Sequence, residues 1–153
     1  MKPWLTDNKT HFIELLKQQS LPHAMIISGV QGAGKTDLAH WLTKTLLCET
    51  LHTENLVNLE SFSDIPCQQC KSCNLYQQQT HPDHINIELT TSSIGVDQIR
   101  NVSRFFEKTA QLATNQVVII EHAEAMTESA ANALLKVIEE ANEISVLSLI
   151  SIQ

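Results

Sequence analysis

Apolar residues in this chain follow two patterns: short runs of strand length and longer stretches with the spacing of one helix face. Mainly apolar runs occupy residues 23–28, 116–121 and 145–150, and residues 84–89 alternate between apolar and polar. Spacings of three to four residues recur at 7–19, 35–48, 95–108 and 127–140. Strands that alternate with helices in this way predict an α/β fold with a central parallel sheet flanked by helices.

The last predicted helix shows how the spacing assigns its faces. Its start is marked by Thr127, whose hydroxyl is suited to cap the first free N–H groups of a helix. The face expected to pack on the sheet consists of Ala131, Leu134, Leu135 and Ile138.

Residues 29–36, Gly-Val-Gln-Gly-Ala-Gly-Lys-Thr, match the phosphate-binding loop G-x-x-x-x-G-K-[ST] between a predicted strand and a predicted helix. Glycines let backbone N–H groups face phosphate oxygens, and the N-terminus of the following helix favours anions. Lys35 is expected to reach the β- and γ-phosphates of a nucleotide, and the Thr36 hydroxyl to bind Mg²⁺. A glycine-rich turn that binds nothing is the alternative. The predicted nucleotide-binding residues of the loop are Gly29, Gly32, Gly34, Lys35 and Thr36.

The apolar run at 116–121 ends in a carboxylate, Glu121. In phosphate-loop proteins a carboxylate at the end of such a strand helps to hold Mg²⁺, which makes Glu121 a further candidate. Hydrolysing members usually have Asp followed by Glu at this place, whereas this chain has Glu121 followed by His122. A buried strand that ends in Glu without a metal-binding role is the alternative.

Four cysteines have the spacing of a metal site. Cys67, Cys70 and Cys73 form C-x₂-C-x₂-C, and Cys48 lies at the end of the helix that follows the phosphate loop. Zn²⁺ favours four tetrahedral ligands, so these thiolates predict one structural zinc site. An iron–sulfur cluster and a redox-active dithiol remain alternatives, although the run lacks the fourth Cys and the Pro of the bacterial cluster motif.

Two histidines near the cysteines could substitute as metal ligands. They are His81 and His84, and we expect them to be isolated surface histidines instead.

Length and net charge limit the number of domains and the kinds of partner to expect. The 153 residues correspond to about one domain, and 10 Lys and Arg against 17 Asp and Glu give a net charge of −7. This balance argues against binding of nucleic acid by bulk electrostatics. The chain has no run of 18 apolar residues, and its N-terminus lacks the apolar core of a signal peptide, so we expect a cytoplasmic protein without a membrane partner.

Arg100 and Arg104, four residues apart on one predicted helix, indicate a solvated face or a contact with a partner.

Several motifs in order resemble one family. After Cys48 and the run from Cys67 to Cys73 come Thr-His-Pro-Asp at 80–83, Gly-Val-Asp-Gln-Ile-Arg at 95–100 and Ala-Ala-Asn-Ala-Leu-Leu-Lys-Val-Ile-Glu-Glu at 130–140. This order is similar to the clamp-loader AAA+ proteins of bacterial DNA polymerase III, most closely the delta-prime subunits and less closely their tau/gamma relatives. The likeness extends over nearly the whole chain, and its last motif is specific to this group.

The resemblance implies a domain organisation. Residues 1–153 would form the N-terminal AAA+ nucleotide-binding domain, with a zinc module inserted at about 48–80. A helical lid and a helical collar follow this domain in the family, and a Ser-Arg-Cys motif would lie just beyond Gln153. The chain stops three residues after a predicted buried strand, so we expect it to be a fragment of a longer protein.

The resemblance also implies a function and partners. The protein would be a clamp-loader subunit that helps to load the sliding clamp onto primed DNA during replication. Its direct partners would be the tau/gamma and delta subunits, and it would meet primed DNA and the clamp through the assembled complex. The implied cofactors are structural Zn²⁺ and, because the phosphate loop is intact, ATP with Mg²⁺. The holoenzyme is a DNA-directed DNA polymerase, whereas we expect this chain to be at most a weak ATPase.

Two other functions remain open. An independent phosphate-loop ATPase or small kinase would need arginines for its acceptor, and the chain has only 10 basic residues. A zinc-dependent DNA-binding module would need a basic face around the cysteine run, where Lys71 is the one basic residue. A clamp-loader subunit needs neither feature.

Overall fold

The computed structural model describes residues 6–18, 22–29, 34–49, 66–89, 91–113, 115–140 and 145–152. Four strands form one sheet in the order β1-β4-β3-β2, and every neighbouring pair is parallel. The strands are β1 (Ala24–Gly29), β2 (His84–Ile87), β3 (Gln116–Ile120) and β4 (Ser145–Ile152). The predicted central parallel sheet is confirmed, and the carboxyl ends of its strands meet at one edge.

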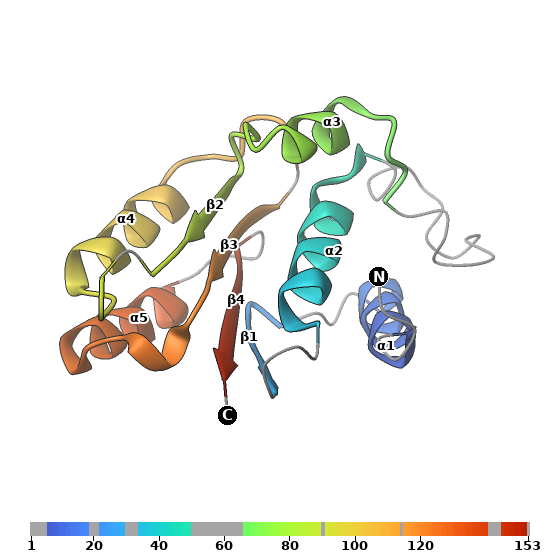
Figure 1. The fold of residues 1–153 in the computed structure, drawn as a ribbon. Helices are drawn as coiled ribbons and strands as arrows, with labels where there is room; N and C mark the ends of the chain where they lie inside the picture. Colours follow the sequence, from blue (N-terminus) through green and yellow to red (C-terminus); the bar gives the residue numbers. More distant parts are fainter. Residues whose placement is uncertain are drawn as a thin grey trace.

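Helices cover both faces of the sheet (Figure 1). In chain order they are α1 (Thr6–Lys17), α2 (Lys35–Leu47), α3 (Lys71–Gln77), α4 (Val96–Glu107), the short 3-10 helix η5 (Ala123–Ala125) and α5 (Glu128–Glu140). Helices α4 and α5 lie on one face, α2 lies on the other with α1 beside it, and α3 lies near the C-terminal end of α2. No helix in the described ranges is long and apolar enough to cross a membrane.

The central strand β3 separates two apolar cores. Its apolar residues are fully buried and alternate between the two faces of the sheet. Val117 packs in the core under α2, where the buried Leu38, Leu42 and Leu46 of that helix also lie. Val118 belongs to the core under α4 and α5. A strand buried on both faces reads as a continuous apolar run, which explains why the sequence predicts this one.

Strand β1 lies at an edge of the sheet and pairs only with β4 among the described strands. Met25 and Ile27 pack against the core under α2. Ile26 points to the opposite face and is 69% exposed. The alternation of a strand therefore leaves a large apolar side chain at this edge in contact with solvent.

A buried carboxylate joins the start of β2 to the turn before β3. Asp83 is 1% exposed, and its two oxygens accept the backbone N–H groups of Gln111, Leu112 and Ala113 at 2.7, 2.8 and 2.7 Å. The same residue continues the strand pairing, because its carbonyl accepts the N–H of Val117 at 2.9 Å. One side chain thus satisfies three donors that the turn directs inward.

Most predicted elements are confirmed, with two differences. Thr127 caps α5, since its hydroxyl accepts the N–H of Ala130 at 3.1 Å. The prediction that Leu135 faces the core is wrong, because this side chain is 59% exposed. The buried stripe of α5 is Ala130, Leu134 and Val137, and Leu135 lies about 100° around the helix from Leu134. Helix α3 was not predicted, since seven residues give too short a window for helical spacing.

We expect Asp83→Asn to lower the free energy of unfolding by about 2 kcal/mol or more. An amide keeps the shape of the side chain but presents an NH₂ group to buried N–H donors that need an acceptor. Denaturant unfolding of both proteins measures the difference. Asp97→Asn is the matched control, because Asp97 is 89% exposed, pairs with Arg100 on the surface of α4, and should change stability by less than about 1 kcal/mol. Equal stability of the Asp83→Asn variant and the wild type would contradict this role.

Candidate functional site

The phosphate loop joins β1 to α2. Gly29 ends β1, and Gly34 adopts a left-handed conformation with φ of 89° directly before α2, which glycine tolerates without strain. The ammonium group of Lys35 donates a hydrogen bond to the carbonyl of Gly29 at 2.9 Å. Thr36 is exposed in the first turn of α2. The candidate Gly32 lies outside the described residues.

The candidate carboxylate Glu121 directly follows β3. Its N–H donates to the carbonyl of Ile87 at 2.9 Å, which extends the pairing of β3 with β2. Its Oε2 accepts a hydrogen bond from Nδ2 of Asn86 at 3.3 Å, and the same nitrogen donates to Oε1 of Glu88 at 3.2 Å. One amide therefore lies between two carboxylates at the carboxyl edge of the sheet.

His122 follows with a left-handed φ of 57° and an exposed side chain. Its Nδ1 lies 3.9 Å from Oε1 of Glu124. The residue that follows Glu121 therefore presents an imidazole at the surface and no carboxylate.

A polar cavity of about 500 Å³ lies between α2, α3 and β2. Ile85 and Ile87 of β2 pack against the core under α4 and α5, whereas His84 and Asn86 of the same strand line the cavity. The cavity also includes His40, Tyr76 and Glu121. The two faces of β2 thus differ, one apolar and one lined with hydrogen-bonding groups.

The two histidines expected at the surface lie in this region instead. His81 is 6% exposed, and its Nδ1 accepts the N–H of Asp83 at 3.0 Å. His84 is half-buried, and its Nδ1 donates to the carbonyl of Val117 at 3.0 Å. Among the described residues neither joins the cysteine group. The surface prediction is wrong for both residues: His81 is buried, and His84, which the strand pairing sets opposite Val117, is half-buried.

Burial controls the protonation of both imidazoles. Loss of hydration lowers the pKa of His84 to about 4, and the nearby His40 and His81 add to the effect, while the hydrogen bond to Val117 opposes it. Burial also lowers the pKa of His81, against the opposing influence of Asp83. His84 is therefore neutral at pH 7 with its Nε2 unprotonated.

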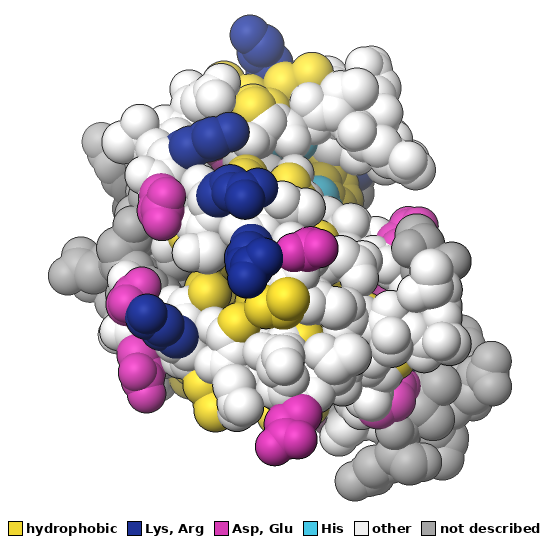
Figure 2. Space-filling model, turned by 90° about the vertical axis from the view of Figure 1, so that its left-hand side faces the viewer, with side chains coloured by type: hydrophobic (Ala, Val, Ile, Leu, Met, Phe, Trp, Pro, Cys, Tyr) yellow, Lys and Arg dark blue, Asp and Glu magenta, His cyan; other side chains and the backbone are white. Residues whose placement is uncertain are grey.

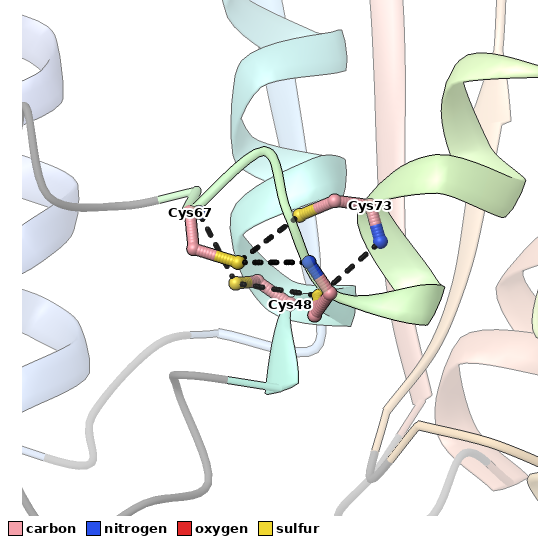
Figure 3. A group of neighbouring side chains, drawn as sticks. Cys48, Cys67 and Cys73 are labelled. Atoms are coloured by element: carbon pink, nitrogen blue, oxygen red, sulfur yellow. Dashed lines mark hydrogen bonds between the residues drawn. The ribbon is translucent and has the colours of Figure 1, made fainter.

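The four predicted metal ligands meet at the ends of α2 and α3 (Figure 3). Cys48 caps the C-terminus of α2, Cys70 is the N-cap of α3, Cys73 lies in its first turn, and Cys67 precedes them in the loop. Their sulfur atoms all lie within 4.8 Å of one another, and the Cys67–Cys73 and Cys48–Cys70 sulfur pairs are 4.0 Å apart. A zinc ion with Zn–S bonds of about 2.3 Å needs sulfur atoms about 3.8 Å apart in a tetrahedron. The donor set fits such an ion.

Backbone N–H groups point at these sulfur atoms. Cys67 Sγ accepts the N–H of Cys70 at 3.3 Å, Cys70 Sγ that of Cys73 at 3.3 Å, and Cys48 Sγ that of Cys67 at 3.4 Å. Gln68 takes up a left-handed φ of 66°, which turns the chain between the first two ligands of the run. Donors aimed at sulfur favour the thiolate form that binds metal.

We expect the free energy of unfolding to fall as the pH drops from about 6.5 to about 4. In this interval the unfolded chain binds a proton at His84, whereas the folded protein, whose His84 pKa is about 4, does not. The contribution is complete above the unfolded pKa and reaches a slope of about 1.4 kcal/mol per pH unit between the two values. Denaturant unfolding at several pH values should show a shallower decline for His84→Gln than for the wild type. Identical slopes would contradict this assignment.

Comparison with known proteins relates the chain to subunits of DNA polymerase III. A family model described as DNA polymerase III, delta subunit, matches residues 5–153. The DNA polymerase III subunit delta' of Pseudomonas aeruginosa is 41% identical over 134 residues, which cover 86% of this chain and 38% of the relative. The corresponding subunit of Haemophilus influenzae is 34% identical over 139 residues, which cover 90% of this chain and 39% of the relative. The chain thus spans about two fifths of the length of these relatives.

The fold has a solved counterpart. A gamma subunit-related protein of DNA polymerase III from Thermotoga maritima superimposes with a TM-score of 0.59 at 21% identity, over 93% of this chain and 38% of that one. At this identity the likeness establishes the fold alone. The subunit tau of Bacillus subtilis is 31% identical over 128 residues, which cover 84% of this chain and 21% of the relative. Because the family model extends over residues 5–153, the chain belongs to the DNA polymerase III delta subunit family, and the relatives from Pseudomonas aeruginosa and Haemophilus influenzae are named as delta' subunits.

Proposed function

We propose that the protein to which this chain belongs is a subunit of the bacterial DNA polymerase III clamp loader. Its role would be to help load the sliding clamp onto primed DNA during replication. The observation that carries the proposal is the family match over residues 5–153, together with relatives named as delta' and tau subunits of this polymerase. Direct partners would be the tau/gamma and delta subunits, and the contact with DNA and clamp would be made by the assembled complex.

The domain proposed for residues 1–153 is an AAA+ nucleotide-binding domain with an inserted zinc module at about 48–80. The parallel sheet with a phosphate loop after β1 and a carboxylate after β3 supports the first part. The four cysteines at the C-terminus of α2, in the loop before α3 and in the first turn of α3 support the second.

Nucleotide binding is proposed as an accessory property of this subunit. Gly29, Gly34, Lys35 and Thr36, with Gly32, would hold the phosphates of ATP, and Glu121 would contribute to Mg²⁺ binding. When bound, ATP with Mg²⁺ supplies a transferable phosphoryl group. Hydrolysis should be negligible in this chain, because His122 stands where a carboxylate would orient water. The subunit would therefore act mainly through contacts with its neighbours.

Helix α4 offers a surface for such contacts. Arg100 and Arg104 are exposed on this helix, and Arg100 forms a surface ion pair with Asp97 at 2.9 Å. Basic side chains follow one another along this side of the molecule, with acidic ones among them (Figure 2). Exposed arginines exchange solvent contacts for a partner's carboxylates at small cost, which makes these two candidate contacts to another subunit.

The cysteine group is proposed to bind one structural Zn²⁺. The closed set of Cys48, Cys67, Cys70 and Cys73 leaves no ligand position for a substrate, and its sulfur spacing matches tetrahedral zinc. An ion there would neutralise thiolates that burial otherwise disfavours, since burial raises the pKa of the Cys73 thiol. Its function would be to fix α3 against the end of α2.

We expect metal analysis of the purified full-length protein to find about one zinc ion per chain. Cys70→Ser should lose most of this zinc and melt at least about 5 °C lower, because the ion links segments that the chain alone holds weakly. Asn74→Ala, an exposed change on the same helix, is the control and should retain both. Full zinc content and unchanged melting in Cys70→Ser, or iron with inorganic sulfide in the wild type, would overturn the assignment.

We expect omission of this subunit to abolish most clamp loading in a reconstituted system. The assay combines the full-length protein with the tau/gamma and delta subunits from the same source and measures primer-stimulated ATPase and loading of the clamp. A subunit that works through contacts should tolerate Lys35→Ala, with less than about a threefold loss, because its own phosphate loop is not the one that hydrolyses ATP.

Two outcomes would contradict this proposal. Unchanged activity without the subunit would exclude a clamp-loader role. Loss of loading in Lys35→Ala as severe as omission would instead identify the protein as a working ATPase.

A further inference from the structure

One side of α2 connects the two candidate sites. Thr36, His40, Lys44 and the C-cap Cys48 follow each other at intervals of four residues, so they form one inclined stripe that turns by about 120° around the helix. Thr36 belongs to the phosphate loop, and Cys48 belongs to the cysteine group. The helix between them has 13 residues and is therefore about 20 Å long.

The three members of the stripe toward the C-terminus of α2 contact residues 66–77, which we call the cysteine segment. Nδ1 of His40 forms a hydrogen bond with the hydroxyl of Tyr76 near the end of α3. The ammonium group of Lys44 donates to the side-chain oxygens of Gln68 and Gln77, the second at 3.2 Å. These contacts join α2 to the loop before α3 and to the last turn of α3.

Cys48 makes the contact at the C-terminal end of the stripe. Its Sγ accepts the N–H of Cys67 at 3.4 Å and lies 4.0 Å from Sγ of Cys70. The segment that the cysteines would fix is therefore the segment that holds α2 along more than half of its length.

The hydrogen bond between Tyr76 and His40 couples the position of α3 to that of α2. The ring of Tyr76 lies 6.0 Å from that of His40 and 5.1 Å from that of His84, which restricts its rotation. Burial raises the pKa of the Tyr76 hydroxyl, so this group stays neutral and able to hydrogen bond with the imidazole. A hydrogen bond that is partly buried from solvent is stronger than one in water.

The opposite side of α2 packs in the apolar core, and the orientation of the helix then depends on the contacts of the stripe. Leu38, Leu42 and Leu46 are 5%, 0% and 1% exposed and pack under the sheet. Apolar packing holds a helix against a sheet but is not directional, so hydrogen bonds on the other side determine its rotation and tilt. A change of tilt moves the first turn of α2 relative to the end of β1, which are the two halves of the phosphate loop.

We infer that the metal centre positions the phosphate loop through His40 and Lys44 of α2. With the cysteines joined by an ion, the segment 66–77 presents Tyr76, Gln68 and Gln77 to α2 in fixed places. His40 and Lys44 are then positioning residues that act on Thr36 through the helix. The inference rests on the proposed metal and nucleotide sites, and it predicts that the two sites influence each other. By linkage, ATP with Mg²⁺ must tighten zinc binding by the factor by which zinc tightens ATP binding.

The first experiment needs no nucleotide. Hydrogen exchange is measured on the full-length protein, with zinc and after chelation, for peptides covering residues 34–43 and 67–77. In the wild type we expect zinc to slow exchange in both segments by about threefold or more. In the double variant Tyr76→Phe, Lys44→Met, zinc should still protect 67–77 but should no longer slow exchange at 34–43.

Matched variants separate positioning from general stability. Lys71→Met removes the same charge as Lys44→Met from an exposed site on α3 and should behave as the wild type. Lys44→Arg, made as a single substitution, keeps a cationic donor and should retain most of the zinc-dependent slowing of exchange at residues 34–43. Zinc-dependent protection of 34–43 that persists in the double variant, or is lacking in a zinc-loaded wild type, would overturn the inference.

A second readout connects the stripe to the nucleotide. Calorimetric titration of the zinc-loaded proteins with ATP and Mg²⁺ should give about fivefold weaker binding for the double variant than for the wild type and Lys71→Met. Equal affinity of all three would overturn the inference. If the wild type binds no ATP, the nucleotide proposal fails, and hydrogen exchange alone still decides whether zinc positions the loop. A wild type that binds no metal would overturn the zinc proposal and this inference together.

Discussion

The parallel pairing of β3 with β4 and β2 is the constraint on which the other features depend. Strand β3 is buried from both faces, so its backbone groups have no water partners and must bond to the neighbouring strands. Parallel strands end at a common edge, and the candidate groups collect there: the phosphate loop after β1, Glu121 after β3, and the polar end of β2. Ligands of open parallel sheets bind at this edge for the same reason.

The parts that the sequence predicts are those with a local signal. The phosphate-loop motif, the buried run of β3 and the cysteine run are each contained in a few consecutive residues. The described ends of the loop follow β1 and begin α2, β3 is buried, and the cysteine sulfur atoms lie together, as predicted. The contact of Asn86 with Glu121 has no local signal, because it depends on the register that sets Asn86 opposite Ile119. Burial of His81 also has no local signal, because the spacing of residues along the chain does not show that its imidazole is 6% exposed in the folded protein.

The two faces of the sheet have different physical roles. Helices α4 and α5 cover their face with a continuous apolar core, which supplies stability and needs little directional bonding. The other face is apolar under α2 and becomes polar over β2, where His84, Asn86 and the hydroxyl of Tyr76 meet in the cavity. A polar network fixes positions more narrowly than apolar packing does. This network lies between the cysteine group and the carboxyl edge of the sheet. At this place it can fix the relative positions of the two candidate sites.

The open edge of β1 affects how this chain behaves in solution by itself. Its outer backbone donors and acceptors have no neighbouring strand among the described residues, and Ile26 adds an exposed apolar side chain at the same place. An edge of this kind accepts any extended chain, including a second copy, and is a starting point for ordered aggregates. The net charge of −7 opposes such association through mutual repulsion, and salt weakens that protection. We therefore expect added salt to increase any association of the isolated chain through this strand.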